Sequence, residues 1–268
     1  MVPRRLFALD KRTMTLILLI TFLSGGNFIA MLLFWPTQTY NMYGNYPVKI
    51  GLRTLPIGFG IIGGAVISLV MIGLSKGRIR IIMPFWTVVM TAFVGAMSVA
   101  DLHNLHTLVY PIVTLANIGV GAVIIPCSII AQIVCPTELI GTITAITLSI
   151  RYIGGAIGFT AFYVIFYHKM NQYGIKVGTE LAVEGVSYNL TTLRTLVTLA
   201  AQSEYANLHE FIEESPNVMM KDKAYELVIQ GTQKAFAKAY QWPYWMSIAF
   251  GGLCVIFSFG LRDMGKLM

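Results

Sequence analysis

Long apolar runs separated by short polar connections form the dominant pattern along this chain. An α-helix rises 1.5 Å per residue, so about 20 apolar residues cross the roughly 30 Å hydrocarbon core of a bilayer. The runs of that length are Thr13–Trp35, Gly51–Leu74, Ile81–Ala100, Leu108–Val134, Thr142–Tyr167 and Tyr244–Leu261. They do not alternate apolar and polar residues as the strands of a membrane β-barrel do. The pattern predicts an all-α fold, a polytopic membrane bundle of six transmembrane helices.

Composition supports a membrane location. Hydrophobic residues make up 56% of the chain and charged residues 12%, and the mean hydropathy is +0.70. A soluble domain carries about 25% charged residues to cover its surface, whereas a disordered chain is poor in apolar residues. Both of those classes are therefore excluded, and the lipid bilayer is the expected partner of this surface.

The polar connections divide the chain into five segments. We expect a cytoplasmic N-terminal segment at 1–12, helices one to five within 13–167, an external loop at 168–241, the sixth helix at 242–261 and a cytoplasmic tail at 262–268. The orientation follows from the basic residues, because Lys and Arg concentrate in short cytoplasmic connections. The loop that carries Lys76, Arg78 and Arg80 is the clearest example, and it predicts that both termini are cytoplasmic.

The long external loop carries an apolar stripe at helical spacing, formed by Leu190, Leu193, Leu196, Val197 and Ala200. Pro216 breaks this pattern, and a second helical stretch is predicted from about Lys221 to Tyr240. The loop is either a cap packed on the bundle or a solvated tether, and the stripe favours the cap. Asn189-Leu190-Thr191 is a glycosylation sequon, so Asn189 is a candidate modification site on an external loop.

Glycines recur within the apolar runs. Gly58-Phe59-Gly60-Ile61-Ile62-Gly63 has the letters of a dinucleotide-binding loop, but that motif requires a strand before it and a helix after it. Here it lies inside a predicted transmembrane helix. Gly60 and Gly64, like Gly154 and Gly158, have the GxxxG spacing that lets two membrane helices approach closely. We therefore predict that these four glycines are helix-packing residues.

Catalytic and metal-binding patterns are weak. The cysteines Cys127, Cys135 and Cys254 lie in or beside the spans, and His103 and His106 lack a third ligand nearby. No phosphate-binding loop, paired catalytic carboxylates or Ser–His arrangement is visible. We therefore expect no enzymatic activity, no metal, no cofactor and no nucleic-acid partner.

One charge lies deep within a predicted span. Arg151 falls about midway along the fifth run, where a charge costs at least about 2.5–3.5 kcal/mol on insertion. It either faces a water-filled cavity and attracts an anionic or carbonyl-bearing substrate, or it donates hydrogen bonds to neighbouring helices. With Arg151, the candidate substrate-path residues are Gln132, Asn27, Asn117 and Ser149. No Asp, Glu or His lies as deep, so a proton-coupling residue is expected in chain outside this sequence.

Several motifs resemble one transporter family. They are Phe34-Trp35-Pro36-Thr37-Gln38, Leu55-Pro56-Ile57-Gly58-Phe59-Gly60, Lys76-Gly77-Arg78-Ile79-Arg80, Leu148-Ser149-Ile150-Arg151-Tyr152-Ile153-Gly154-Gly155-Ala156-Ile157-Gly158 and Ala235-Phe236-Ala237-Lys238-Ala239-Tyr240. Together they resemble the C-terminal half of fungal major facilitator superfamily transporters of the fourteen-span trichothecene efflux pump type.

The resemblance implies a drug:proton antiporter that exports a small organic toxin, drug or siderophore-like compound. It also implies a plasma membrane location in preference to the vacuolar membrane. The antiporter motif and coupling carboxylates of the family's N-terminal half are not in this sequence, so we expect a C-terminal half or fragment. Its partner is then the N-terminal half or a second copy in a homodimer. The alternative is an orphan membrane protein that does not transport.

Overall fold

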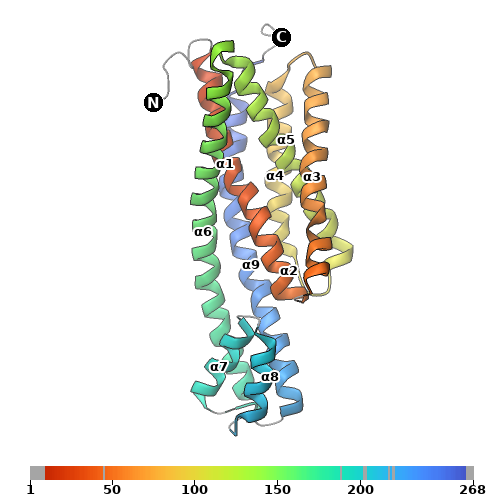
Figure 1. The fold of residues 1–268 in the computed structure, drawn as a ribbon, viewed down its shortest axis with the longest axis vertical. Coiled ribbons are helices and arrows are strands. Elements are labelled where there is room, and N and C mark those ends of the chain that lie inside the picture. Colours follow the sequence, from red (N-terminus) through yellow and green to blue (C-terminus); the bar gives the residue numbers. More distant parts are fainter. Residues whose placement is uncertain are drawn as a thin grey trace.

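The computed structural model describes residues 10–44, 46–187, 189–201, 204–216, 218 and 221–263. Within these ranges the secondary structure is entirely helical (Figure 1). Six helical stretches are long and apolar enough to cross a membrane, so the expected fold class is confirmed. They are α1–α2 (Lys11–Ile29 and Trp35–Tyr43, joined by a π-helical turn at Ala30–Phe34), α3 (Pro47–Leu74), α4 (Ile79–Ala96, with a 3-10 turn at Met97–Val99), α5 (Tyr110–Val134, preceded by a π-helical turn at Leu105–Val109), α6 (Ile140–Val183, preceded by a 3-10 turn at Thr137–Leu139) and α9 (Lys221–Phe259).

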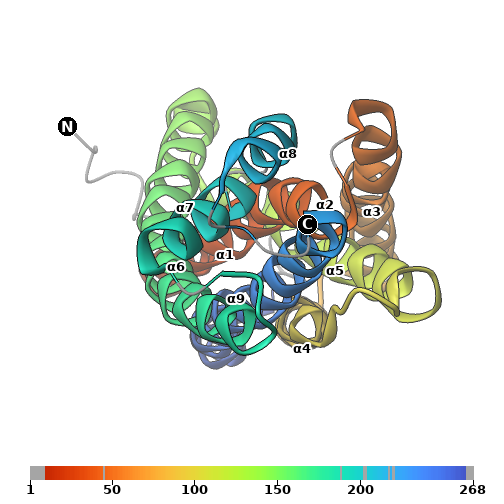
Figure 2. The same ribbon diagram turned by 90° about the horizontal axis from the view of Figure 1, so that it is seen from below.

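The bundle has a central pair of helices, α1 and α5, seen along the long axis in Figure 2. α4 and α9 pack against each other and against this pair, while α3 and α6 lie at the two flanks. α3 packs chiefly on α5, and α6 packs chiefly on α1 and α9. The flanking helices have one well-covered face each and leave many large apolar side chains exposed, as helices in contact with lipid do.

Glycines form the closest helix contacts. A Cβ on Gly64 of α3 would overlap the backbone of Ile118 on α5. On the other flank, a Cβ on Gly158 of α6 would lie 2.7 Å from the Cα of Gly26 on α1. Two backbones approach this closely because the glycine carries no side chain at the contact, and association in lipid depends on such close packing. Gly60 and Gly154 lie one helical turn before these positions and make similar contacts with Asn117 and Phe22.

Two helices extend beyond the spans expected from the sequence. α6 continues past Tyr167 to Val183, and α9 already begins at Lys221 and passes through Pro243 without ending. A proline within a helix removes one backbone hydrogen bond. A membrane helix tolerates this loss where neighbouring helices satisfy the freed carbonyl group. The first helix likewise continues past Trp35 to Tyr43 after its π-helical turn, so Pro36 lies at the start of a helical segment.

The helical extensions form a small second unit with α7 (Leu190–Ala201) and α8 (Tyr205–Glu214), below the bundle in Figure 1. It has an apolar core of its own, which includes Leu193 and Leu196 from the expected stripe, Leu208 from α8 and Val228 from α9. Leu193, Leu196 and Ala200 of the stripe are therefore buried between helices, so this segment is a packed helical unit with its own core and not a solvated tether. The side chain of Leu190 lies outside the described residues, as do residues 1–9 and 264–268 of the two expected cytoplasmic segments.

Aromatic side chains gather where the bundle meets this unit. The ring of Trp242 on α9 lies 3.8 Å from the ammonium group of Lys169 on α6, and its indole N–H donates to the hydroxyl of Tyr173. Trp245 packs edge-on against Trp242. Tryptophan and tyrosine concentrate at the membrane–water interface, so this cluster indicates the level at which α6 and α9 leave the bilayer.

Candidate substrate path

Arg151 connects α6 to α5 in the middle of the bundle. Its Nη2 donates to the carbonyl oxygen of Ile124 at 2.9 Å and to the hydroxyl of Ser128 at 2.6 Å. The Nε is buried and has no hydrogen-bond partner among the described residues. The only ion pair found in the described part of the chain joins His209 and Glu213, so no carboxylate there neutralises Arg151. Among the described residues, neutral dipoles alone hold this guanidinium.

A second polar contact joins the same two helices. The amide Nε2 of Gln132 on α5 donates to the hydroxyl of Thr144 on α6 at 2.9 Å, and that hydroxyl donates to the carbonyl of Ile140. Thr144 and Arg151 are separated by two turns, so the two contacts lie about 10 Å apart along α6. Arg151, Ser128, Gln132 and Thr144 are each only half-buried or partly buried. We call these four residues the α5–α6 polar seam.

Asn27 lies on α1, next in sequence to Gly26, which contacts Gly154 and Gly158 of α6. Its side chain is fully buried, and neither atom of its amide group has a hydrogen-bond partner in the described structure. A Cβ on the nearby Gly25 would overlap the carbonyl oxygen of Arg151, which places this part of α1 against the seam helix α6. An unpaired buried amide costs about 1–3 kcal/mol.

The remaining predicted path residues lie elsewhere. Asn117 is buried in the contact between α3 and α5, where its Nδ2 donates to the carbonyl of Val113 at 2.8 Å. Ser149 is exposed on α6, away from the α5 partners of Arg151. Ser128 and Thr144, which make the shortest contacts of the seam, were visible in the sequence only as polar residues within spans. Their partners depend on how α5 and α6 pack, which no spacing along the chain reveals.

These features define a multi-pass membrane protein with six bilayer-length helices and a polar seam between α5 and α6. The family model described as fungal trichothecene efflux pump (TRI12) matches residues 1–268, and the chain belongs to this family. It is also similar to the trichothecene efflux pump TRI12 of Fusarium sporotrichioides, with 24% identity over 271 residues. That similarity covers 98% of this chain and 43% of the relative, so the chain spans less than half of the relative's length. The family resemblance inferred from the sequence is confirmed.

Proposed function

We propose that this chain forms one wall of the cavity through which an efflux pump exports a small, oxygen-rich organic compound. The observation that carries the proposal is the unneutralised Arg151, held on Ser128 and the Ile124 carbonyl within the membrane. A guanidinium in such surroundings interacts strongly with a carbonyl, hydroxyl or carboxylate oxygen, because little water competes for it.

The substrate class follows from the mixture of groups along the path. The seam offers one cation and several neutral hydrogen-bonding groups within walls that are otherwise apolar. This favours an amphipathic toxin, drug or siderophore-like compound with several oxygens. The relative from Fusarium sporotrichioides is described as a trichothecene efflux pump, and we propose a compound of that kind as the first substrate to test.

The second wall and the coupling to protons are assigned to another six-helix unit. Transport cavities of repeat-built carriers form between two such units. A proton-coupled pump also needs a titratable group in the membrane, normally Asp, Glu or His, and the α5–α6 polar seam has none. We propose that an N-terminal half or a second copy supplies both.

Export of a labelled trichothecene from cells that express a pump containing this chain tests the proposal. Arg151→Ala removes a charge-assisted contact of about 1.5–3 kcal/mol, which lowers the apparent substrate affinity roughly 10- to 100-fold. Thr160→Val on the exposed face of α6 is the matched control and leaves export unchanged. If Arg151→Ala exports as well as the control at equal surface expression, Arg151 is a structural residue and the proposed path is wrong.

A further inference from the structure

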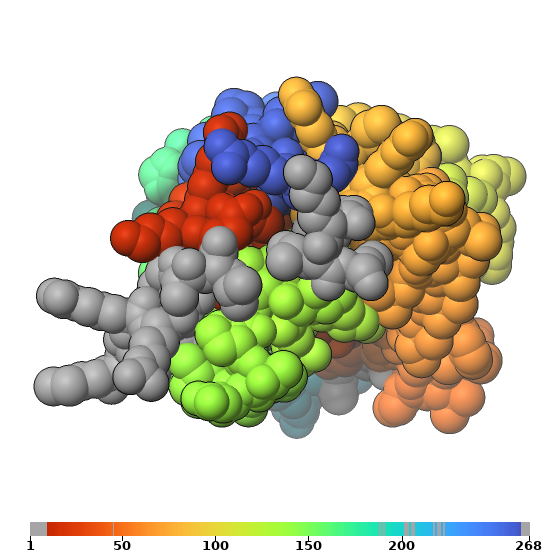
Figure 3. All heavy atoms as spheres, turned by 90° about the horizontal axis from the view of Figure 1, so that it is seen from above, coloured from red at the N-terminus to blue at the C-terminus, as the bar shows by residue number. Residues whose placement is uncertain are grey.

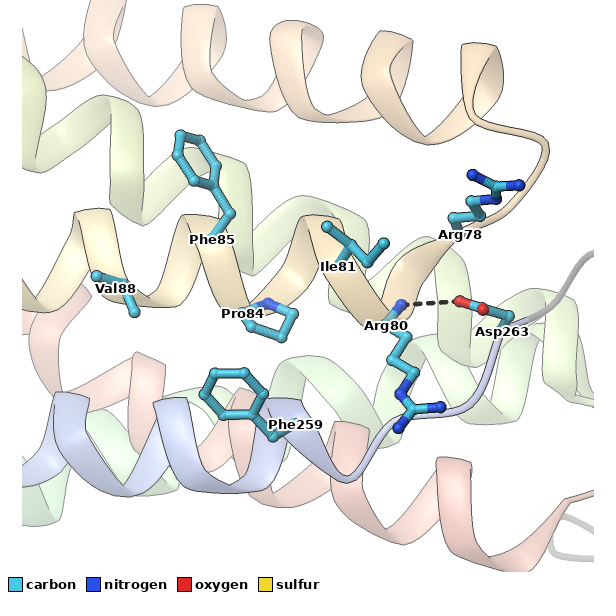
Figure 4. A pocket seen from close by; sticks show the side chains of 8 residues that line it. All are labelled: Arg78, Arg80, Ile81, Pro84, Phe85, Val88, Phe259 and Asp263. Carbon is cyan, nitrogen blue, oxygen red and sulfur yellow. Dashed lines mark hydrogen bonds between the residues drawn. The ribbon is translucent and has the colours of Figure 1, made fainter.

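A second feature of the bundle lies outside the substrate path. An open groove of about 960 Å³ runs between α4 and α9, at the end of the bundle where α9 terminates (Figure 4). Seen from above, the turn between α3 and α4 lies beside the last described residues of α9 (Figure 3). The groove therefore begins at one end of the bilayer-spanning region and extends into it.

The inner part of the groove is apolar. Ile81, Phe85 and Val88 recur at helical spacing on α4 and are 67%, 53% and 47% exposed. Phe259 of α9 lies near Pro84 of α4 (Figure 4) and is 64% exposed. The distance along α4 from Ile81 to Val88 is about 10 Å. These side chains form an apolar trough, open to the surroundings, with the length of several methylene groups.

The mouth of the groove is basic. Arg78 and Arg80 lie there with exposed side chains, and neither guanidinium has an ion-pair partner among the described residues. The carboxylate at the mouth, Asp263, accepts a hydrogen bond from the backbone N–H of Arg80 at 3.1 Å (Figure 4). Asp263 thereby satisfies a free N–H in the first turn of α4. The two cations at the mouth outnumber this one carboxylate.

We propose that this groove binds an anionic glycerophospholipid. The phosphate lies between Arg78 and Arg80, and one acyl chain follows Ile81, Phe85 and Val88. Arginine matches phosphate oxygens with two parallel N–H donors, and exposed apolar side chains in a bilayer are covered by acyl chains. The charge complementarity selects an anionic headgroup over a zwitterionic one. The groove also lies at the end of the bundle predicted to be cytoplasmic, where anionic lipids are abundant.

Native mass spectrometry of the purified, delipidated chain tests this site, with phosphatidylserine and phosphatidylcholine of identical acyl chains as probes. Phosphatidylserine is expected to bind at least about 10-fold more tightly. Each basic residue near an anionic headgroup contributes about fivefold to binding. The double variant Arg78→Gln/Arg80→Gln therefore loses roughly 20- to 30-fold in phosphatidylserine affinity and binds the two lipids alike.

Lys76→Gln is the matched control, because Lys76 lies in the same loop but does not line the groove. It is expected to change phosphatidylserine affinity less than about twofold. An equal loss per charge in Lys76→Gln shows a diffuse surface attraction and overturns the proposal. All these side chains are exposed, so the variants fold, and an unchanged unfolding temperature verifies this.

Two further measurements test the acyl chain. Val88→Trp fills the apolar trough and is expected to weaken phosphatidylserine binding about as much as the loss of one arginine. Unchanged binding in this variant overturns the assignment of the trough. Glycerophosphoserine, which has the headgroup without acyl chains, is expected to bind at least 100-fold more weakly than phosphatidylserine. Equal binding of the two probes shows a soluble-anion site and overturns the lipid assignment.

Discussion

Gly63 and Gly64 are adjacent on α3 but have different surroundings. A Cβ at Gly63 meets no heavy atom within 4 Å. A Cβ at Gly64 would overlap the carbonyl oxygen of Ile118 and lie 2.7 Å from its carbonyl carbon. Ordinary carbon contacts are about 3.5–4.0 Å, so Gly64→Ala forces α3 away from α5 by about 1 Å. The same substitution at Gly63 requires no movement.

The two variants share every other consequence of adding a methyl group. Both gain about 1 kcal/mol of helix propensity, because alanine loses less backbone entropy than glycine on forming a helix. Overpacking costs about 1–3 kcal/mol, and at Gly64 the obstacle is backbone that cannot rotate away. The free energy of unfolding should therefore differ between the variants by about 1–3 kcal/mol, with Gly64→Ala the less stable.

The buried thiols provide the assay. Cys127, Cys135 and Cys254 are all free and buried, so a thiol-reactive dye reports unfolding in detergent. At roughly 2–4 °C per kcal/mol, Gly64→Ala should unfold about 2–12 °C below Gly63→Ala. Gly63→Ala should unfold at or above the temperature of the parent chain. Equal unfolding temperatures for the two variants would refute the argument that α3 and α5 are in backbone contact at this position.

Three further outcomes are expected. Tyr244→Phe removes the 2.7 Å donor to the buried Oε1 of Gln38 and should cost about 1–3 kcal/mol in the same assay, whereas a phenylalanine at an exposed tyrosine should cost nothing. Hydrogen bonds from Thr13, chiefly through its hydroxyl, lower the pKa of Asp10 below its ordinary value. Its stabilisation of α1 is then present above about pH 4 and lost as the pH falls below that, so Asp10→Asn should flatten the acid side of the stability profile. Asn189 is exposed just before α7, so expression in a secretory pathway should add a glycan to it. Glycosidase treatment should then increase the gel mobility of the parent chain and leave that of Asn189→Gln unchanged. If glycosidase leaves the mobility of the parent chain unchanged, the segment that contains Asn189 lies on the cytoplasmic side.

The membrane class and the number of spans were accessible from the sequence because they depend on local quantities. A run of about 20 apolar residues has the length of the hydrocarbon core whatever its neighbours are, and the charge content excludes a soluble surface. The glycine spacing at Gly154 and Gly158 likewise identifies a face for close packing. The expected ends of the fifth and sixth spans differ from the observed helices, because the polar extensions of α6 and α9 are stabilised by a second apolar core.

The partners of each helix were decided by tertiary packing alone. The sequence placed Arg151 in mid-membrane and left open whether it faces a cavity or bonds to another helix, and the structure shows bonds to Ile124 and Ser128 of α5. Likewise, no periodicity brings Arg80 of α4 beside Asp263, which lies 183 residues further along the chain. Apolar periodicity and length are properties of one helix. Contacts between helices depend on which faces fit together, and that is determined only when the whole bundle packs.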